Sequence, residues 1–265
     1  MKLTLEVSQL IGGRENQEDC ISISCDIGNF TLNDNSNLSL TDLDALLLAV
    51  CDGMGGHEAG EVASEFVSRN FISSFKDHLN ENKNITEALK FACLFSNQSL
   101  GDEINSQPSL VGMGTTLVGV ILSQYTLNWI SVGDSHLYLF RQGKLQKLNQ
   151  DHSMVPVIEA MVARGLITTE EALNHPDRNA LRSVINGEDI LLLDDGIQNF
   201  KLIKDDIIIL ATDGIDVLSP KQIAKLIKGN FWNFKKNPAI QIKDGIETLN
   251  LKNNDNATIC VVRVQ

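Results

Sequence analysis

The sequence predicts an α+β protein with a central antiparallel β-sandwich flanked by pairs of helices, a four-layer αββα arrangement. The main observation is that segments with helical periodicity follow one another in pairs, whereas the βαβ units of a parallel sheet would need one helix at each crossover. The second observation is length. At 265 residues the chain is long for one domain but within the range of β-rich domains, so we expect a single domain over 1–265 with an insertion.

Short apolar runs bounded by polar or turn residues predict the strands of the two sheets. These runs are Leu3–Val7, Ile21–Cys25, Leu46–Cys51, Thr116–Leu122, Leu127–Val132, Leu137–Phe140, Ile207–Ala211 and Thr258–Val264.

Four segments place apolar residues at the three- and four-residue spacing of one helix face. The first two are Glu61–Phe75 and Ile85–Phe95, which are consecutive, and the second two are Lys221–Lys228 and Ala239–Leu249, just before the last strand.

Two segments show neither the strand pattern nor the helical pattern. Asp26–Asp44 is rich in Asn, Asp and Ser and predicts a long polar loop or hairpin. From Gln150 to Asp189 the strand pattern lapses, and we expect an insertion, at about 150–190, with short helices at Val155–Ala163 and Thr169–Leu173.

Charge and composition exclude several classes of protein. The formal net charge is −12, which argues against binding to nucleic acid or to an anionic membrane, because those partners attract clustered Lys and Arg. There is no basic and apolar leader and no apolar run of about 18 residues, so we expect a cytoplasmic protein. The five cysteines form no Cys-x-x-Cys pair, which favours buried, reduced thiols.

Acidic residues recur at the ends of the predicted strands. Four places stand out: Glu18-Asp19, Asp52-Gly53, Asp213-Gly214 and Asp255-Asn256. Each alone is typical of a turn. Together they predict a cluster of hard oxygen ligands, which select Mg²⁺ or Mn²⁺, and a two-metal hydrolytic site that activates water for attack on phosphorus.

The motifs resemble, in order from Arg14 to Asn256, those of the bacterial-type 2C family of metal-dependent serine/threonine protein phosphatases. The resemblance implies that Arg14 clamps the substrate phosphate and that Glu18 and Asp19 hold metal-bound waters, with Asp19 counted among the metal residues. It further implies that Asp52 bridges two ions and that Gly53 supplies its carbonyl, within the segment from Ala49 to His57.

The remaining motifs complete the implied metal centre. Asp213 and Asp255 match two further metal-binding aspartates, and Asp134, in Val132-Gly133-Asp134-Ser135-His136, matches the residue that helps to hold a third, weaker ion. Asp216 stands three residues after Asp213, where the family has an acidic residue at four. The family carries a histidine after its Asp-Gly pair in animal members, but Met54 stands here.

The resemblance implies a cytoplasmic, monomeric signalling hydrolase acting on the phosphorylated protein substrates of a serine/threonine kinase. His57 is either a general acid or structural, and Gly112–Leu117 serves either packing or chemistry. The 150–190 insertion resembles the family's flap. No cysteine precedes an arginine at the spacing of a cysteine phosphatase, and no phosphate-binding glycine loop is present. A partner-specific regulatory phosphatase and a non-catalytic binding module of the same fold remain as alternatives.

Overall fold

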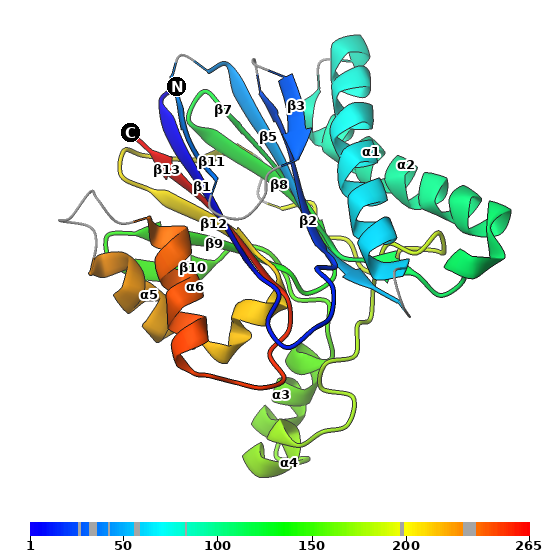
Figure 1. The fold of residues 1–265 in the computed structure, drawn as a ribbon, viewed down its shortest axis with the longest axis vertical. Helices are drawn as coiled ribbons and strands as arrows, with labels where there is room; N and C mark the ends of the chain where they lie inside the picture. The colour runs from blue at the N-terminus through cyan, green and yellow to red at the C-terminus, as the bar shows by residue number, and fades with distance from the viewer. Residues whose placement is uncertain are drawn as a thin grey trace.

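Two antiparallel β-sheets pack face to face and carry helices on both outer faces (Figure 1). The computed structural model describes residues 1–25, 28–31, 36–41, 43–55, 59–82, 84–196, 199–229 and 237–265. The predicted four-layer αββα sandwich is confirmed. Both faces of each sheet are covered, which explains why strands such as β2 and β8 are buried along their whole length and appear in the sequence as continuous apolar runs.

The first sheet joins the two ends of the chain. Its strands, in spatial order, are β10 (Lys144–Lys147), β9 (His136–Arg141), β12 (Ile207–Ala211), β13 (Ala257–Val264), β1 (Leu3–Leu10) and β4 (Asn37–Leu40). The pairing of β1 with β13 runs from Leu3 opposite Val264 to Leu10 opposite Ala257. Because Leu10 pairs with Ala257, the segment that follows β1 and the segment that precedes β13 lie at the same end of this sheet.

The second sheet is built mainly from the first half of the chain. Its strands, in spatial order, are β11 (Phe200–Lys201), β8 (Thr126–Val132), β7 (Leu117–Ser123), β5 (Ala45–Met54), β2 (Asp19–Cys25) and β3 (Gly28–Thr31), and β6 (Gly114–Thr115) pairs with β5 beside them. Large side chains such as Ile21, Leu48 and Trp129 fill the space between the two sheets, where they meet Leu5 and Leu210 of the first sheet.

The helices form the two outer layers in pairs, as predicted. Helices α1 (Ala59–Asn82) and α2 (Ile85–Ser106) cover the second sheet, and α5 (Pro220–Lys228) and α6 (Pro238–Thr248) cover the first. The sequence also marks where α2 and α5 begin: the side chain of Asn84 accepts hydrogen bonds at the start of α2, and Ser219 forms a capping box at the start of α5. No helix in the described part of the chain is long and apolar enough to cross a membrane.

The prediction of one polar loop or hairpin at Asp26–Asp44 is wrong for the residues that the structure describes there. Strand β3 pairs with β2 in the second sheet, and β4 pairs with β1 in the first, so the segment passes from one sheet to the edge of the other. Each strand has four residues, too few for a hydrophobic pattern to emerge against the polar composition. Strands β6, β10 and β11 were missed for the same reason.

The predicted insertion extends from one end of the sandwich and contains α3 (Val155–Ala163) and α4 (Thr169–Leu173) (Figure 1). Two isolated bridges fasten the insertion and the chain that follows it to the strands, Thr115 to Ile185 and Ser131 to Asp194, and a third bridge, Ser153 to Leu181, lies within the insertion. Its base is therefore tied to the ends of the strands, on the same rim as the acidic residues.

Candidate functional site

The predicted acidic residues come from both sheets and meet at one end of the sandwich. Asp19 on β2 stands opposite Asp52 on β5 in the strand register. Asp213 follows β12 and Asp255 precedes β13, each separated from its strand by one residue. Asp134 lies in the turn between β8 and β9. A single cluster is thus assembled from residues 19 to 255 by the strand order alone.

The electrostatics of these carboxylates show that they lie close together. Burial raises the pKa of Asp52 well above its usual value, and the charges of Asp19, Asp213, Asp134 and Asp255 raise it further. Burial likewise raises the pKa of Asp19 and of Asp134 to about 7, and that of Asp213 to about 6, with neighbouring aspartates adding to each shift. Several carboxylates crowded in a buried place repel one another and need a positive charge.

The cluster fits a hard divalent cation. Asp19 is 6% exposed; its Oδ2 accepts a hydrogen bond of 2.9 Å from the Thr212 hydroxyl, whereas its Oδ1 is buried without a partner. Such an orphaned carboxylate oxygen is a ready cation ligand. In the described part of the chain, however, no three His, Cys, Asp or Glu side chains are close enough to hold one ion by themselves. Water and backbone carbonyls would therefore complete the ligand sets.

Gly53 is required for close packing at the site. A Cβ on this residue would lie 2.1 Å from the Gly60 carbonyl oxygen and 2.6 Å from that of Glu18. The φ of Gly53 lies outside the left-handed region, so the close approach of α1 to β5 is the reason that only glycine fits.

Hydroxyl groups of the Gly112–Leu117 motif fix the main chain of Asp52. The amide of Asp52 donates to the Thr116 hydroxyl at 3.0 Å, and the Thr115 hydroxyl donates to the Asp52 carbonyl at 2.8 Å. These contacts are structural, and they place the Asp52 carboxylate rather than touch it. The predicted packing role of this motif accounts for them.

The loop that carries Arg14 is held by Asn256, whose role the sequence analysis missed. The Asn256 amide group donates to the carbonyls of Ile11 and Asn16 at 2.8 and 3.0 Å, and its Oδ1 accepts from the amide of Glu18 at 2.8 Å. Asn256 is 3% exposed. An amide side chain directly before a buried strand is the one sequence signal that pointed to it.

Arg14 and Glu18 lie at the exposed edge of the cluster. The Arg14 guanidinium pairs with the Asp255 carboxylate at 2.5 Å, so the predicted phosphate clamp contacts a predicted metal residue in this structure. Both side chains are substantially exposed, at 51% and 40%. Partial burial raises the pKa of Glu18, and Arg14 opposes that shift, which places Glu18 beside the same pair.

A buried histidine of the insertion supports the turn that carries Asp134. The amide of Gly133 donates to His152 Nδ1 at 3.2 Å, and the amide of His152 donates to the Gly133 carbonyl at 3.1 Å. Burial lowers the pKa of His152, which favours the neutral ring that this acceptor role requires. The base of the insertion and the Asp134 turn therefore form one rigid unit.

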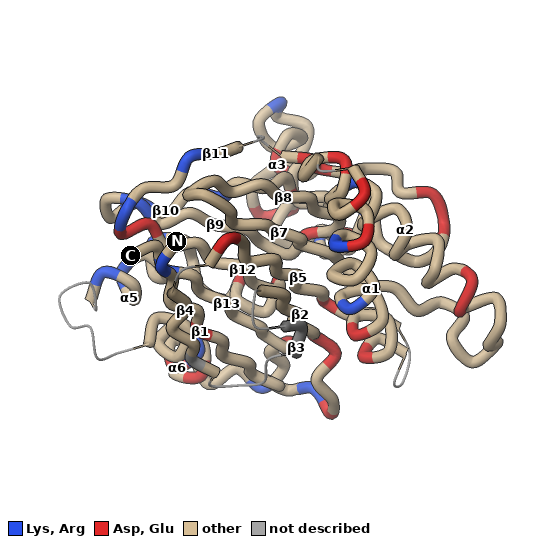
Figure 2. The backbone as a smooth tube through the Cα atoms, turned by 90° about the horizontal axis from the view of Figure 1, so that it is seen from above, with Lys and Arg blue, Asp and Glu red and all other residues tan. Residues whose placement is uncertain are grey.

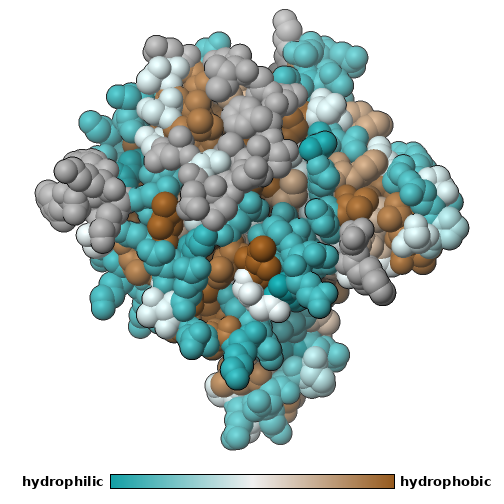
Figure 3. All heavy atoms as spheres, in the orientation of Figure 1, coloured by the Kyte–Doolittle hydropathy of each residue, from teal (hydrophilic) through white to brown (hydrophobic). Residues whose placement is uncertain are grey.

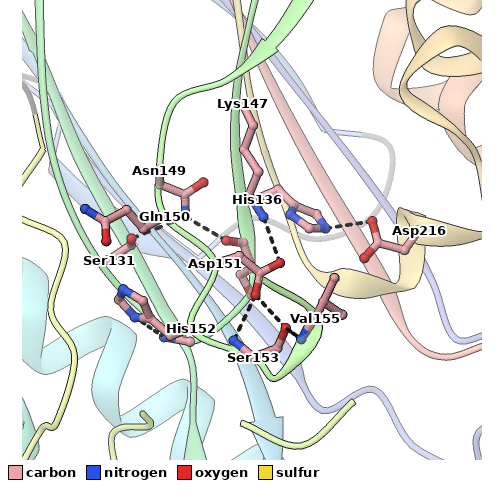
Figure 4. A network of polar contacts seen from close by, with 12 residues as sticks. Ser131, His136, Lys147, Asn149, Gln150, Asp151, His152, Ser153, Val155 and Asp216 are labelled. Atoms are coloured by element: carbon pink, nitrogen blue, oxygen red, sulfur yellow. Dashed lines mark hydrogen bonds and ion pairs between the residues drawn. The ribbon is translucent and has the colours of Figure 1, made fainter. Parts of the chain in front are cut away.

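The shifted acidic residue Asp216 faces His136 at the start of β9 (Figure 4). His136 Nε2 lies 2.8 Å from Asp216 Oδ1, without the alignment of a hydrogen bond. The same view shows Lys147 and Ser153 in contact with Asp151 beside this pair, and Asn149 bonded to Ser131 and to the Ser135 carbonyl. The candidate general acid His57 lies outside the described residues.

We expect the metal-free chain to be more stable at pH 5 than at pH 8. The raised pKa values of Asp19, Asp134 and Asp213, about 6 to 7, exceed the roughly 4 of unfolded aspartates. Between these values the folded chain binds more protons than the unfolded chain, so the stabilisation is complete below pH ~4 and is lost as the pH rises through ~7. Urea unfolding with a chelator at the two pH values measures this difference.

Glu6, which lies outside the cluster, also has a raised pKa and provides the control. Burial raises the pKa of Glu6 on β1 to about 7. Glu6→Gln removes that contribution and is expected to leave most of the pH dependence in place. Equal stability at pH 5 and pH 8 in this variant would contradict the crowded-carboxylate description.

A rim of buried carboxylates closing a four-layer αββα sandwich is the architecture of the metal-dependent protein phosphatases. The chain belongs to the Protein phosphatase 2C family, whose profile matches residues 28–235. Serine/threonine protein phosphatase PstP of Mycobacterium tuberculosis is 36% identical over 149 residues, which cover 55% of this chain and 27% of the relative. The chain thus matches about a quarter of the length of that relative.

One further relative and a solved structure of PstP match over larger shares of both chains. Serine/threonine phosphatase stp of Listeria monocytogenes is 33% identical over 177 residues, 66% of this chain and 68% of the relative. The crystal structure of the PstP catalytic domain in complex with two manganese ions has a TM-score of 0.66 and 27% identity over 99% of this chain and 100% of that chain.

Proposed function

We propose that residues 1–265 act as one catalytic domain that hydrolyses phosphoserine and phosphothreonine in proteins with the help of two Mn²⁺ or Mg²⁺ ions. The observation that carries this proposal is the convergence of Asp19, Asp52, Asp213 and Asp255 from both sheets at one rim of the sandwich, where burial and neighbouring charges raise the pKa values of the first three. Membership of the Protein phosphatase 2C family, and the two manganese ions of the PstP structure, support the same chemistry.

The role that we propose for each residue of the cluster follows from its position. Asp52, at the centre of the cluster, would bridge the two ions, and the Gly53 carbonyl, Asp213 and Asp255 would complete their ligand sets. Glu18 and Asp19 would hold water bound to the ions, and Asp134 would contribute to a third, weaker site. When bound, the ions supply positive charge for the phosphoryl oxygens and lower the pKa of a bound water.

Arg14 would orient the substrate phosphate. Its guanidinium is exposed and lies at the mouth of the cluster, where a bidentate interaction with phosphate oxygens would replace its contact with Asp255. Binding of substrate would then free the Asp255 carboxylate for its ion. Phosphorylated proteins made by a serine/threonine kinase are the substrates that this arrangement fits, in a monomeric protein of the cytoplasm.

The test is hydrolysis of a phosphothreonine peptide and of p-nitrophenyl phosphate, with Mn²⁺ and with a chelator, by the wild-type chain and by Asp213→Asn. Turnover should require metal and should fall by about a hundredfold or more in the variant, because one ion loses a charged ligand. Mn²⁺ binding is measured in parallel by calorimetry.

The outcomes separate the competing functions. Metal binding without turnover on either substrate would favour a partner-specific regulatory phosphatase. Absence of metal binding by the folded chain would make it a non-catalytic binding module of the same fold. Full activity of Asp213→Asn would remove Asp213 from the metal centre.

A further inference from the structure

A basic groove runs along β10 and α5 toward the end of the first sheet that is opposite the acidic cluster. Strand β9 begins at His136, beside the cluster, and ends at Arg141, about 17 Å away at ~3.3 Å per residue. There the hairpin of Gln142 and Gly143 leads into the edge strand β10, which packs against α5. Figure 2 shows blue segments gathered at β10, α5 and β11, although the chain as a whole is acidic.

Four lysines line the groove between β10 and α5, a hollow of about 530 Å³ with Leu145 and Ala224 in its wall. They are Lys144, Lys221, Lys225 and Lys228. All four are exposed, and in the described part of the chain none of them has an acidic side chain within ion-pair distance. A chain with 34 acidic and 22 basic residues therefore concentrates unpaired positive charge here.

The positions of the lysines on α5 are regular. Lys221, Lys225 and Lys228 are separated by four and three residues, so they share one face of the helix, while Ile223 and Ile227 are buried against the sheet. Helix α5 follows directly on the segment that carries Asp213 and Asp216, with only Leu218 and Ser219 between them. The stripe of lysines thus begins near the acidic cluster and leads away from it.

Backbone geometry helps to shape the far end of the groove. Gln142 and Gly143 both have positive φ, 50° and 79°, as in the tight turns that glycine permits. A Cβ on Gly143 would lie 2.6 Å from Lys228 Cε, so the glycine leaves room for the Lys228 side chain across the hairpin. Gly143 and Lys228 also line a second hollow of about 510 Å³, so the two hollows adjoin at these residues.

The second hollow is basic for a different reason. It contains Arg141, Lys204 and the two acidic residues Asp205 and Asp206. Asp206 is 1% exposed and accepts hydrogen bonds of 2.8 and 2.6 Å from Arg141, so its charge is neutralised within the protein. Among the acidic residues that line this hollow, only Asp205 has a charge left to offset the positive charges of Lys204 and Lys228.

Protection of an edge strand does not explain the pattern. Lysines on an edge strand discourage pairing with other strands, which would account for Lys144 and Lys147. It does not account for the lysines of α5, which lie on a helix. Lys225 and Lys228 lie in the last turn of α5, where positive charge stabilises the helix, whereas Lys221 lies in the first turn, where it does not.

We propose that the groove between β10 and α5 binds an acidic segment of the phosphoprotein substrate, rich in Asp and Glu, while the phosphorylated residue occupies the acidic cluster. This inference rests on the proposed function and specifies the class of substrate. We choose an acidic occupant on the ground of electrostatic complementarity. The rest of the acidic surface repels such a segment, whereas the lysine stripe attracts it along a path that begins near the cluster. About five residues span the distance of about 17 Å in extended form, and a flexible Gly/Ser linker of about eight residues has an r.m.s. span of roughly 16 Å, which matches it.

The direct test is binding of a fluorescent peptide with six glutamates and no phosphate, followed by fluorescence anisotropy. It compares the wild-type chain, Lys221→Glu/Lys225→Glu, and the control Lys76→Glu/Lys90→Glu, whose lysines lie exposed on α1 and α2 of the opposite layer. We expect affinity to fall about tenfold or more in the groove variant only, and binding of all three to disappear in 1 M salt, where the Debye length is about 3 Å.

The kinetic test uses a phosphothreonine peptide with a six-glutamate tail, joined by about eight Gly and Ser residues, and the same peptide with a glutamine tail. The glutamate tail should lower KM about tenfold for the wild type and the control, without a change in kcat, and should lose this effect in the groove variant. All three proteins should hydrolyse the glutamine-tailed peptide alike.

Failure of the proposed function and failure of the groove proposal would give different results. If none of the proteins hydrolyses either peptide, the proposed function is wrong, and the anisotropy still decides the groove. Hydrolysis with equal KM for the two tails, or equal peptide affinity in the wild type and the groove variant, would overturn the groove proposal. So would binding to phosphatidylserine vesicles in place of the peptide.

Discussion

Replacement of Asp52 with asparagine is expected to abolish metal-dependent turnover and, at the same time, to stabilise the metal-free chain. Asp52 lies in a buried place where four other aspartates raise its pKa. Loss of the central carboxylate should lower kcat/KM about a thousandfold, because an isosteric amide is a poor bridging ligand. Removal of one negative charge should raise the melting temperature at pH 8 in chelator by roughly 3–6 °C.

The control for this prediction is Asp244→Asn, which removes an exposed charge on α6 that does not contribute to the shifted pKa of Asp52. It should change neither turnover nor melting temperature. Addition of Mn²⁺ should reverse the order of stability, since the wild-type chain gains binding free energy that Asp52→Asn largely lacks. Turnover within tenfold of wild type in Asp52→Asn would exclude this residue from the metal centre.

The second large effect is expected in the packing of α1 on the second sheet. Gly119, in the middle of β7, lies under Phe71, which is fully buried, and a Cβ at position 119 would lie 2.3 Å from Phe71 Cζ. Gly119→Val should therefore lower the free energy of unfolding by about 3 kcal/mol, although valine is favoured in strands. Thermal unfolding should show a loss of roughly 6–12 °C.

A double-mutant cycle identifies the clash as the cause. Phe71→Leu removes the ring that valine would meet, so the double variant should be less destabilised than the sum of the two single variants. Gly229→Ala is the matched control: the nearest atom to its Cβ would be 3.6 Å away, and its φ is −56°. Additive effects of Gly119→Val and Phe71→Leu would show that the contact is not what makes glycine necessary.

Elements of ordinary length could be predicted from the sequence because local patterns specify them. All eight predicted strands and the four predicted main helices are present, and α3 and α4 have the predicted bounds. Strands of two to four residues, such as β10 and β3, could not be predicted, because their pairing depends on a neighbour that is remote in sequence. Helix α1, which extends to Asn82, was underestimated because its last turns are polar.

Some residues of the candidate site could be predicted from the sequence, and others could not. Asp19, Asp52, Asp213 and Asp255 could be chosen because each lies at the end of an apolar run and matches a family motif. Asn256 and His152 could not, since their roles are hydrogen bonds to main-chain groups that only the folded chain brings near. The contact of Arg14 with Asp255 joins residues 241 positions apart.

Hydrophobic periodicity and motif residues are local properties of the chain, so the sequence was enough to predict the layers of the fold and the family, and to select the carboxylates that we propose as metal ligands. Tertiary structure alone decided which of these carboxylates share one buried volume, how the 150–190 insertion is fastened to the Asp134 turn, and where the lysines of β10 and α5 meet. These features depend on strand order and on the burial of charge, which arise only when distant segments pack together.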